Sequence, residues 1–254
     1  MKPKARLAHV AEIIDLTPHL RRIIVTGDDL NGFPADQDGA YVKVILPEAA
    51  TKQPNLDLHG EQRPLMRSYT IREFDPQTNR LVLDFVVHRH QGPATDWAAT
   101  AQPGDPVGIA GPGPMKLTDF NAPAYLLVGD LTSVNAVNGY GKWIHPQAEI
   151  RALIQTPTAE DLIDLDIDER AEVQWLVDDS DSPDRLADAI LSHLSQLPAD
   201  THIFLGLEAR QIRTLRNVLQ GDAGIPRQQI HVTGYWKKGV DADKFGQEKQ
   251  RNPL

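Results

Sequence analysis

The segment Gly111-Pro112-Gly113-Pro114 separates two halves of the chain that have different patterns. Before it, short apolar runs alternate with turn residues such as Asn31-Gly32 and Asp38-Gly39, which is typical of successive strands. Many short strands with one helix favour an antiparallel barrel. The predicted strands are Leu20–Val25, Tyr41–Leu46, Ser68–Ile71, Leu81–Val87 and Val107–Ala110, and the predicted helix is Pro93–Ala101.

After Pro114, strand-like and helix-like stretches alternate, which predicts a parallel sheet with covering helices. The expected fold is therefore a two-domain α/β protein, with an N-terminal antiparallel β-barrel at 1–118 and a C-terminal α/β domain at 119–254. The predicted strands are Ala124–Val128, Glu149–Ile154, Ala171–Val177, Thr201–Leu205 and Gln229–Thr233, and the predicted helices are Ser133–Ile144, Arg185–Leu197 and Ala209–Leu219.

Composition excludes several classes of function. The 254 residues carry a formal charge of −9, so nucleic acid is not an expected partner. The absence of cysteine excludes disulfides, thiolate metal sites and cysteine nucleophiles. No apolar run approaches the roughly 18 residues of a membrane helix, and the N-terminus lacks a signal-peptide pattern, so we expect a cytoplasmic protein without membrane insertion.

The most informative segment is Arg67-Ser68-Tyr69-Thr70. On a strand, Arg67 can bind the oxygens of a diphosphate with its planar guanidinium group. Tyr69 can lie along a flavin ring, and Thr70 can hydrogen-bond to the ring or the ribityl chain. The alternative interpretation is an ordinary surface strand with a buried tyrosine.

Two further segments extend this pattern. Val87-His88 is followed by Gly92-Pro93-Ala94-Thr95-Asp96-Trp97, where the first amides of a helix can hold a phosphate. The chain later contains Gly234-Tyr235-Trp236-Lys237-Lys238-Gly239. Together with the Arg-x-Tyr-Thr segment, these elements resemble the siderophore-interacting protein family of ferric-siderophore reductases, within the ferredoxin-reductase-like superfamily.

The resemblance implies a non-covalent FAD, with NADPH or NADH as the electron donor and a ferric siderophore as the substrate. For Trp97 and Trp236, packing in the core is the alternative to a cofactor contact. The residues that the resemblance assigns to cofactor binding are Arg67, Ser68, Tyr69, Thr70, Val87, His88, Gly92, Ala94, Thr95, Trp97, Asp130, Thr132, Tyr235 and Trp236.

The nicotinamide site is marked less clearly than the flavin site. Asp130 and Thr132 follow a predicted strand and open a helix, as nucleotide-binding residues do, but a plain helix N-cap is the alternative. Leu131 and Leu207 depart from the family pattern of Asp-Glu-Thr and Ala-Gly-Glu. These departures leave open a ferredoxin-like protein as the electron donor.

Basic residues stand where the family holds an anionic ferric complex: Lys43, Lys116, Lys237 and Lys238. We predict that Lys43, Lys116 and Lys238 converge on the mouth of the flavin cleft, and solvated surface lysines are the alternative. A non-catalytic protein that binds a siderophore or a flavin is a further hypothesis, although it gives no role to a complete nucleotide-type domain.

No metal site is predicted. The spacing of His88 and His90 places both on one face of a strand, but two ligands without a nearby third do not make a metal site. The segment Asp178-Asp179-Ser180-Asp181 lacks the order of a calcium loop, so we expect a loop and a helix cap. Because redox transfer through a flavin requires no acid or base, no catalytic residue is assigned.

Overall fold

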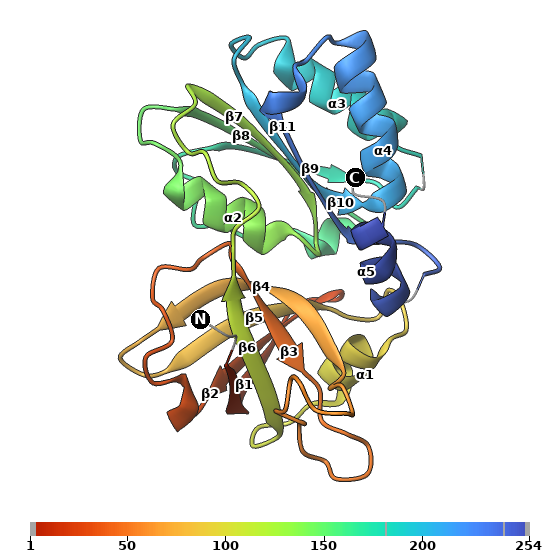
Figure 1. The fold of residues 1–254 in the computed structure, drawn as a ribbon. Helices are drawn as coiled ribbons and strands as arrows, with labels where there is room; N and C mark the ends of the chain where they lie inside the picture. The colour runs from red at the N-terminus through yellow and green to blue at the C-terminus, as the bar shows by residue number, and fades with distance from the viewer. Residues whose placement is uncertain (1–3, 181, 241, 252–254) are drawn as a thin grey trace. The chain divides into compact units, whose positions relative to one another are not determined.

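The computed structural model describes residues 4–180, 182–240 and 242–251. The chain divides into two compact units, Met1–Met115 and Lys116–Leu254 (Figure 1). The first is a closed antiparallel barrel and the second is a parallel sheet with helices, which confirms the predicted fold class.

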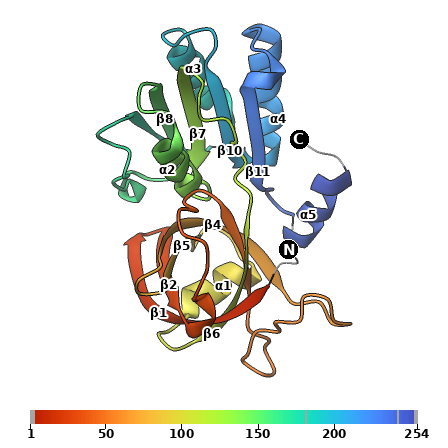
Figure 2. The same ribbon diagram turned by 60° about the vertical axis from the view of Figure 1, so that its left-hand side comes forward.

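The barrel closes in the order β1-β2-β5-β4-β3-β6 (Figure 2). Every neighbouring pair is antiparallel. The helix α1 follows β5 in the chain. The elements are β1 (Ala5–Thr17), β2 (Leu20–Thr26), η1 (Asp28–Leu30), β3 (Tyr41–Ile45), β4 (Met66–Asp75), β5 (Arg80–Val86), α1 (Pro93–Thr100) and β6 (Pro106–Gly113).

The barrel core explains why these segments form strands. Ile23 of β2 pairs with Leu83 of β5, which in turn pairs with Ile71 of β4. All three side chains are at most 1% exposed. Burial of each such side chain contributes about 1.5–3 kcal/mol, so the inward-facing aliphatic residues of neighbouring strands fix the register.

The second unit is a five-stranded parallel sheet in the order β11-β10-β7-β8-β9. Its elements are β7 (Ala124–Asp130), α2 (Val134–Trp143), β8 (Glu149–Thr156), η2 (Ala159–Asp161), β9 (Glu172–Val177), α3 (Asp184–Leu194), β10 (His202–Glu208), α4 (Ala209–Asn217), η3 (Val218–Asp222), η4 (Arg227–Gln229), β11 (Ile230–Trp236) and α5 (Ala242–Arg251).

Helices cover both faces of this sheet. Leu205 of β10 packs in one cluster with Leu186 of α3 and Ile212 of α4. The adjacent Phe204 points to the opposite face, because side chains alternate along a strand. There its ring lies 5.0 Å from that of Tyr140 on α2. Both faces are therefore buried, as expected of a parallel sheet.

Of the observed strands and α-helices, β1 and α5 were not predicted. Only Ala8 and Val10 are buried along the 13 residues of β1, so its apolar alternation is weak. The helix α5 is polar, and Phe245 is its buried aromatic residue.

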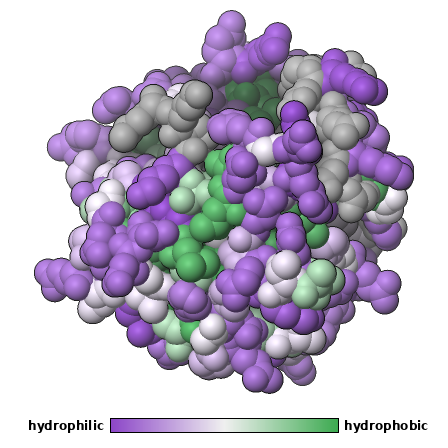
Figure 3. Space-filling view, turned by 60° about the horizontal axis from the view of Figure 1, so that its bottom comes forward, coloured by the Kyte–Doolittle hydropathy of each residue, from purple (hydrophilic) through white to green (hydrophobic). Residues whose placement is uncertain are grey.

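No helix in the described part of the chain is long and apolar enough to cross a membrane. Figure 3 shows one face, on which hydrophilic side chains surround smaller apolar areas.

Candidate functional site

The Arg67–Thr70 segment lies on β4, where Arg67 and Tyr69 point to one face and Ser68 and Thr70 to the other. The side chains of Arg67 and Thr70 are both buried, whereas Ser68 is exposed. The Arg67 Nη1 donates to the Met66 carbonyl at 2.8 Å. Ser68 Oγ accepts a hydrogen bond from Lys43 Nζ at 2.7 Å, because these residues face each other in the β3–β4 register. The structure therefore brings together Lys43, a predicted substrate-binding residue, and Ser68, a predicted cofactor-binding residue.

An aromatic row connects β4 to α1. The ring centroids of Tyr69 and Phe85 are 4.0 Å apart, and those of Phe85 and Trp97 are 5.6 Å apart. Tyr69 and Trp97 both pack against the barrel core, so Trp97 has the packing role considered from the sequence. Burial raises the pKa of the Tyr69 hydroxyl, which remains protonated at neutral pH. Sequence reasoning did not single out Phe85, although it follows Leu83 on the same strand face.

The start of α1 leaves backbone donors without a capping side chain. Gly92 is the N-cap residue, and no side chain caps the helix. Apart from Gly92 and its two neighbours in the chain, no described residue has an atom within 4 Å of the position that a Cβ on Gly92 would take. Ala94 and Thr95 are buried, and Thr95 Oγ1 lies 3.2 Å from His90 Nε2. A small anion can therefore approach these amides from the open side of Gly92.

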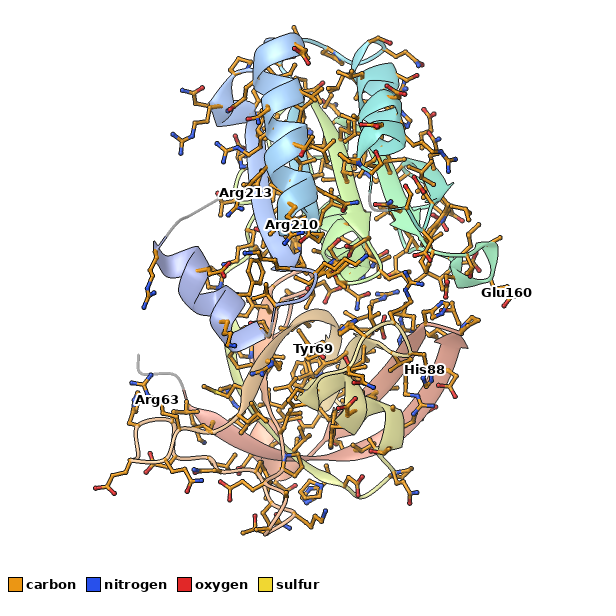
Figure 4. All side chains as sticks on the ribbon, turned by 90° about the vertical axis from the view of Figure 1, so that its right-hand side faces the viewer. Arg63, Tyr69, His88, Glu160, Arg210 and Arg213 are labelled. Carbon is orange, nitrogen blue, oxygen red and sulfur yellow. The ribbon has the colours of Figure 1, made fainter. Side chains whose placement is uncertain are left out.

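The sequence placed His88 and His90 on one face of a strand, and this placement is wrong. The strand β5 ends at Val86, and His88 has a positive φ of 60°. Figure 4 labels His88 together with Tyr69 in the barrel unit. Val87, next to His88, is buried at 1%. Within the described residues, no three His, Asp or Glu side chains form a group able to hold a metal ion.

In the second unit, Asp130 connects the β7–α2 turn to the end of β11. Its Oδ1 accepts hydrogen bonds from Thr132 N at 2.8 Å and from Thr132 Oγ1 at 2.5 Å. Its Oδ2 accepts one from Trp236 Nε1 at 2.8 Å. Removal from water raises the pKa of Asp130, although these hydrogen bonds oppose the shift. The structure thus brings together three predicted cofactor residues.

The N-cap of α2 is Ser133, so the alternative that made Asp130 or Thr132 a plain N-cap is wrong. Ser133 Oγ donates to the Gly206 carbonyl at 2.5 Å and accepts from Asp130 N at 3.0 Å. A Cβ on Gly129 would lie 2.5 Å from this oxygen. Glycine is therefore required for the close contact, and this glycine was the sequence signal that could have identified Ser133.

A second network follows the carboxyl ends of the strands. Glu208 Oε2 accepts from the amides of Arg210 and Gln211, and Glu208 Oε1 accepts from Lys238 N at 3.2 Å. Gln211 Nε2 donates to Gln155 Oε1 at 3.2 Å. Sequence reasoning assigned no role to Glu208, Gln211 or Gln155. Their contacts join β8, β10, α4 and β11 at one end of the sheet.

The departures at Leu131 and Leu207 have a structural explanation. Leu131 is 6% exposed, and Leu207 is fully buried in the apolar cluster of the parallel sheet. Both side chains contribute to packing in the α/β unit.

The predicted lysines belong to different units. Lys43, Lys116 and Lys238 are exposed, whereas Lys237 forms an ion pair with Glu248 of α5. Lys116 also donates its backbone N–H to Tyr140 Oη at 3.0 Å. Tyr235 is half-buried on β11. The convergence of Lys43 with the other two lysines remains a prediction.

Comparisons with known proteins cover both units. Residues 9–115 match the siderophore-interacting FAD-binding domain, and residues 122–239 match the siderophore-interacting protein domain. A siderophore utilization protein from T. fusca has 30% sequence identity and a TM-score of 0.77, with 95% of each chain covered. The chain belongs to the siderophore-interacting protein family.

Other members of this family are similar along nearly the whole chain. SipS from Aeromonas hydrophila has 29% identity and a TM-score of 0.83, with 98% of each chain covered. The ferric vibriobactin reductase ViuB of Vibrio cholerae serotype O1 is 29% identical over 246 residues, which are 92% of this chain and 90% of ViuB. Both similarities extend over both units of this chain.

The barrel residues fit the FAD that its domain family implies. FAD carries a diphosphate and a planar ring system. The guanidinium of Arg67 and the uncapped amides at the start of α1 are suited to the diphosphate. The open space over Gly92 leaves room for a phosphate to approach the backbone. Thr70 supplies a further buried hydroxyl on β4.

Proposed function

We propose that this chain is a ferric-siderophore reductase that uses FAD and takes electrons from NADH or NADPH. The uncapped start of α1 beside an open Gly92 is the observation that carries the proposal, since it provides the anion site that a dinucleotide cofactor requires. The similarity to a protein named ferric vibriobactin reductase supports the reaction. Bound FAD supplies hydride acceptance and one-electron transfer to Fe(III).

The residues of this chain bind and orient the reactants. When FAD is bound, Arg67 would hold its diphosphate and Thr70 would supply a hydroxyl to the flavin part of the cofactor. The Tyr69–Phe85–Trp97 row holds β4 and α1 in place. Asp130 and Trp236 are joined by a hydrogen bond that holds the β7–α2 turn in place, and this turn is where we propose that the nicotinamide nucleotide binds. The iron belongs to the substrate. Hard oxygen chelators bind Fe(II) more weakly than Fe(III), so reduction releases the metal from the siderophore.

An anaerobic assay tests this function. The FAD-loaded protein is mixed with NADH or NADPH, and bleaching of the flavin absorbance is followed by stopped flow. Ferric hydroxamate and catecholate complexes are then added, and Fe(II) is trapped with a coloured chelator. We expect bleaching followed by Fe(II) formation in amounts that depend on the complex.

The other outcomes identify the alternatives. Protein that is colourless and does not bind added FAD would refute the proposal. If dithionite bleaches the flavin and Fe(II) forms but neither nucleotide bleaches it, the donor is a ferredoxin-like protein. Binding of a ferric complex without Fe(II) formation from the reduced protein would indicate a non-catalytic binding protein.

The lysines are proposed to attract an anionic ferric complex. Combined replacement of Lys43, Lys116 and Lys238 by Ala should raise the KM for anionic complexes several-fold, with FAD content and flavin reduction unchanged. A neutral ferric hydroxamate should be affected much less, and added salt should reduce the difference. Lys244→Ala, at an exposed position on α5, is the control. Equal effects on neutral and anionic complexes would show that these lysines are ordinary surface charges.

A further inference from the structure

The helix α1 ends on carbonyl groups that its own segment leaves without donors. In a continuing helix, the carbonyls of Ala98 and Ala99 would accept from the amides of residues 102 and 103. Residue 103 is a proline and has no N–H, and the amide of Gln102 donates to Asp105 Oδ2 at 2.8 Å. The last turn of α1 also contains no basic residue. The donors and the positive charge that favour a helix C-terminus must therefore come from another element.

Arg21 of β2 supplies both the donors and the charge. Its Nη1 donates to the carbonyl of Ala98 at 3.0 Å and to that of Ala99 at 2.8 Å. Asp15 of β1 holds the guanidinium group from its other side, since Arg21 Nε donates to Asp15 Oδ1 at 2.6 Å and Nη2 donates to Oδ2 at 3.2 Å. The hydrogen bond from Arg21 lowers the pKa of Asp15, so this carboxylate stays ionised at neutral pH. The Arg21 side chain is 16% exposed, so these bonds are largely shielded from water.

The register of the barrel strands brings Arg21 to the helix. Arg21 lies opposite Phe85 in the β2–β5 pair, and residues that lie opposite each other on antiparallel strands point to the same side of the sheet. The ring of Phe85 lies 5.6 Å from that of Trp97 on α1. Arg21 therefore faces α1 from the same side as Phe85. The aromatic contact holds the middle of the helix, and Arg21 holds its C-terminus.

We propose that Arg21 is a positioning residue for FAD, which keeps α1 folded and thereby keeps the amides at the start of this helix in place for the diphosphate. The inference rests on the proposed function, because it assigns a residue to the cofactor site of that function. A helix of eight residues is too short to be stable alone. Its first amides are therefore in position only while contacts with other elements keep the helix folded.

The action of Arg21 on the cofactor is indirect. The eight residues of α1 span about 12 Å at 1.5 Å per residue. Arg21 binds the last turn, whereas the uncapped amides follow Gly92 at the first turn. The charge of Arg21 is also paired with that of Asp15. The helix thus separates Arg21 from the bound diphosphate, which Arg67 is suited to contact directly.

The size of the effect depends on the fraction of molecules in which α1 is folded. FAD finds the complete set of amides only in those molecules, so the observed Kd rises in inverse proportion to this fraction. A tenfold rise in Kd corresponds to α1 being folded in about one tenth of the apoprotein molecules. The local folding of α1 and the affinity for FAD are therefore expected to change together.

Hydrogen exchange and FAD titration of the full chain test this relation. In the Arg21→Ala apoprotein, we expect the amides of residues 96–101 to lose protection while those of β2 and β5 keep theirs, and the Kd for FAD to rise about 5- to 20-fold. Saturating FAD should restore much of the protection of α1, because FAD binds the folded helix. Arg21→Lys keeps the charge and should recover part of the affinity. Arg80→Ala is the matched control, since Arg80 of the same barrel pairs with Glu12 of β1, and it should change neither quantity.

Two results would overturn the proposal. The first is an unchanged FAD affinity in Arg21→Ala, because a purely structural role would lower stability to urea without changing the Kd of the folded protein. The second is a higher Kd with the protection of residues 96–101 unchanged. If Arg21→Ala does not fold, Arg21→Gln replaces it, and an unchanged Kd in that variant has the same meaning.

The same experiment separates this proposal from the proposed function. A parent protein that does not bind FAD would overturn both. If FAD binds and Arg21→Ala behaves as expected but no ferric complex yields Fe(II), the role of Arg21 stands and the proposed reductase function is wrong.

Discussion

The two units build their candidate sites in opposite ways. In the barrel, the polar groups come from one strand and one short helix, and the start of α1 has no capping side chain. In the α/β unit, the groups come from the ends of several strands and satisfy one another, as Asp130 does with Thr132 and Trp236. The backbone amides at the start of α1 are thus suited to a ligand that stays bound. The sheet is organised before a ligand arrives, which suits a nucleotide that enters and leaves.

The largest effect is expected for the aromatic row of the barrel. Trp97→Ala should lower the free energy of unfolding by about 3 kcal/mol, because the ring packs on Phe85 and the barrel core. Urea titration measures this loss. Trp97→Phe should recover most of the stability, and Trp143→Ala, at a position 37% exposed, is the control. A Trp97→Ala variant that keeps its stability but loses FAD would show that Trp97 acts through cofactor contact.

The next effect tests whether the barrel donors serve a ligand. Arg67→Ala should raise the Kd for FAD by about 10- to 100-fold, since a charge-assisted hydrogen bond contributes about 1.5–3 kcal/mol. Fluorescence titration of the apoprotein with FAD gives this value. Arg72→Ala, on the same strand, should bind FAD nearly as the parent protein does. The contrast between the units would fail if Arg67→Ala lowered stability and left FAD affinity unchanged.

The converse is expected in the α/β unit. Trp236→Phe removes the indole donor to Asp130 and should lower the free energy of unfolding by about 1 kcal/mol, with FAD content unchanged. A double-mutant cycle with Asp130→Asn isolates the contribution of this pair from that of the Thr132 donors. If the losses of stability in Trp236→Phe and Asp130→Asn were additive in the double variant, this result would contradict a direct interaction between the two side chains.

The smallest effect concerns pH. Burial lowers the pKa of His193, which is 5% exposed and lies 2.8 Å from Gln174 Oε1 through Nε2. In the unfolded chain, the His193 imidazole therefore becomes protonated near pH 6.5, whereas in the folded chain it becomes protonated only at a lower pH. Stability should be retained above this pH and fall as the pH drops through the folded pKa.

Thermal unfolding between pH 7.5 and 5.5 measures this dependence. His193→Gln should reduce it, whereas His59→Gln, at an exposed position, should leave it unchanged. Burial also lowers the pKa of His231. This residue therefore accounts for part of the pH dependence that remains in the His193→Gln variant, in the same direction. An unchanged pH dependence in His193→Gln would assign the whole effect to other groups.

The fold class could be predicted because strand and helix periods are local properties. Each predicted barrel strand overlaps an observed one, since burial follows the apolar residues that define it. The strand β1 was missed because Ala8 and Val10 are its only buried side chains, and the helix α5 was missed because its sequence is polar. Pairing with β2 and β6 holds β1 in the barrel.

The candidate site was predictable only where its residues are neighbours in the chain. Arg67, Tyr69 and Thr70 form a recognisable segment, whereas Trp236 and Asp130 are 106 residues apart and meet through the order of the parallel strands. The sequence predicts a loop at Asp178, but it does not show that the Oδ2 atom of this residue is buried without a hydrogen-bond partner among the described residues. This burial depends on contacts with other segments, which no short motif encodes.

Closure of the barrel also bears on how the protein avoids self-association. Each barrel strand is paired on both sides, so this unit presents no edge strand to another chain. The parallel sheet has two edges, β11 and β9. The strand β9 has only six residues and exposes Glu172 and Gln174, features that discourage edge-to-edge pairing. Resistance to aggregation therefore depends on closure of the sheet in one unit and, at the β9 edge of the other, on the shortness of the strand and its two exposed polar side chains.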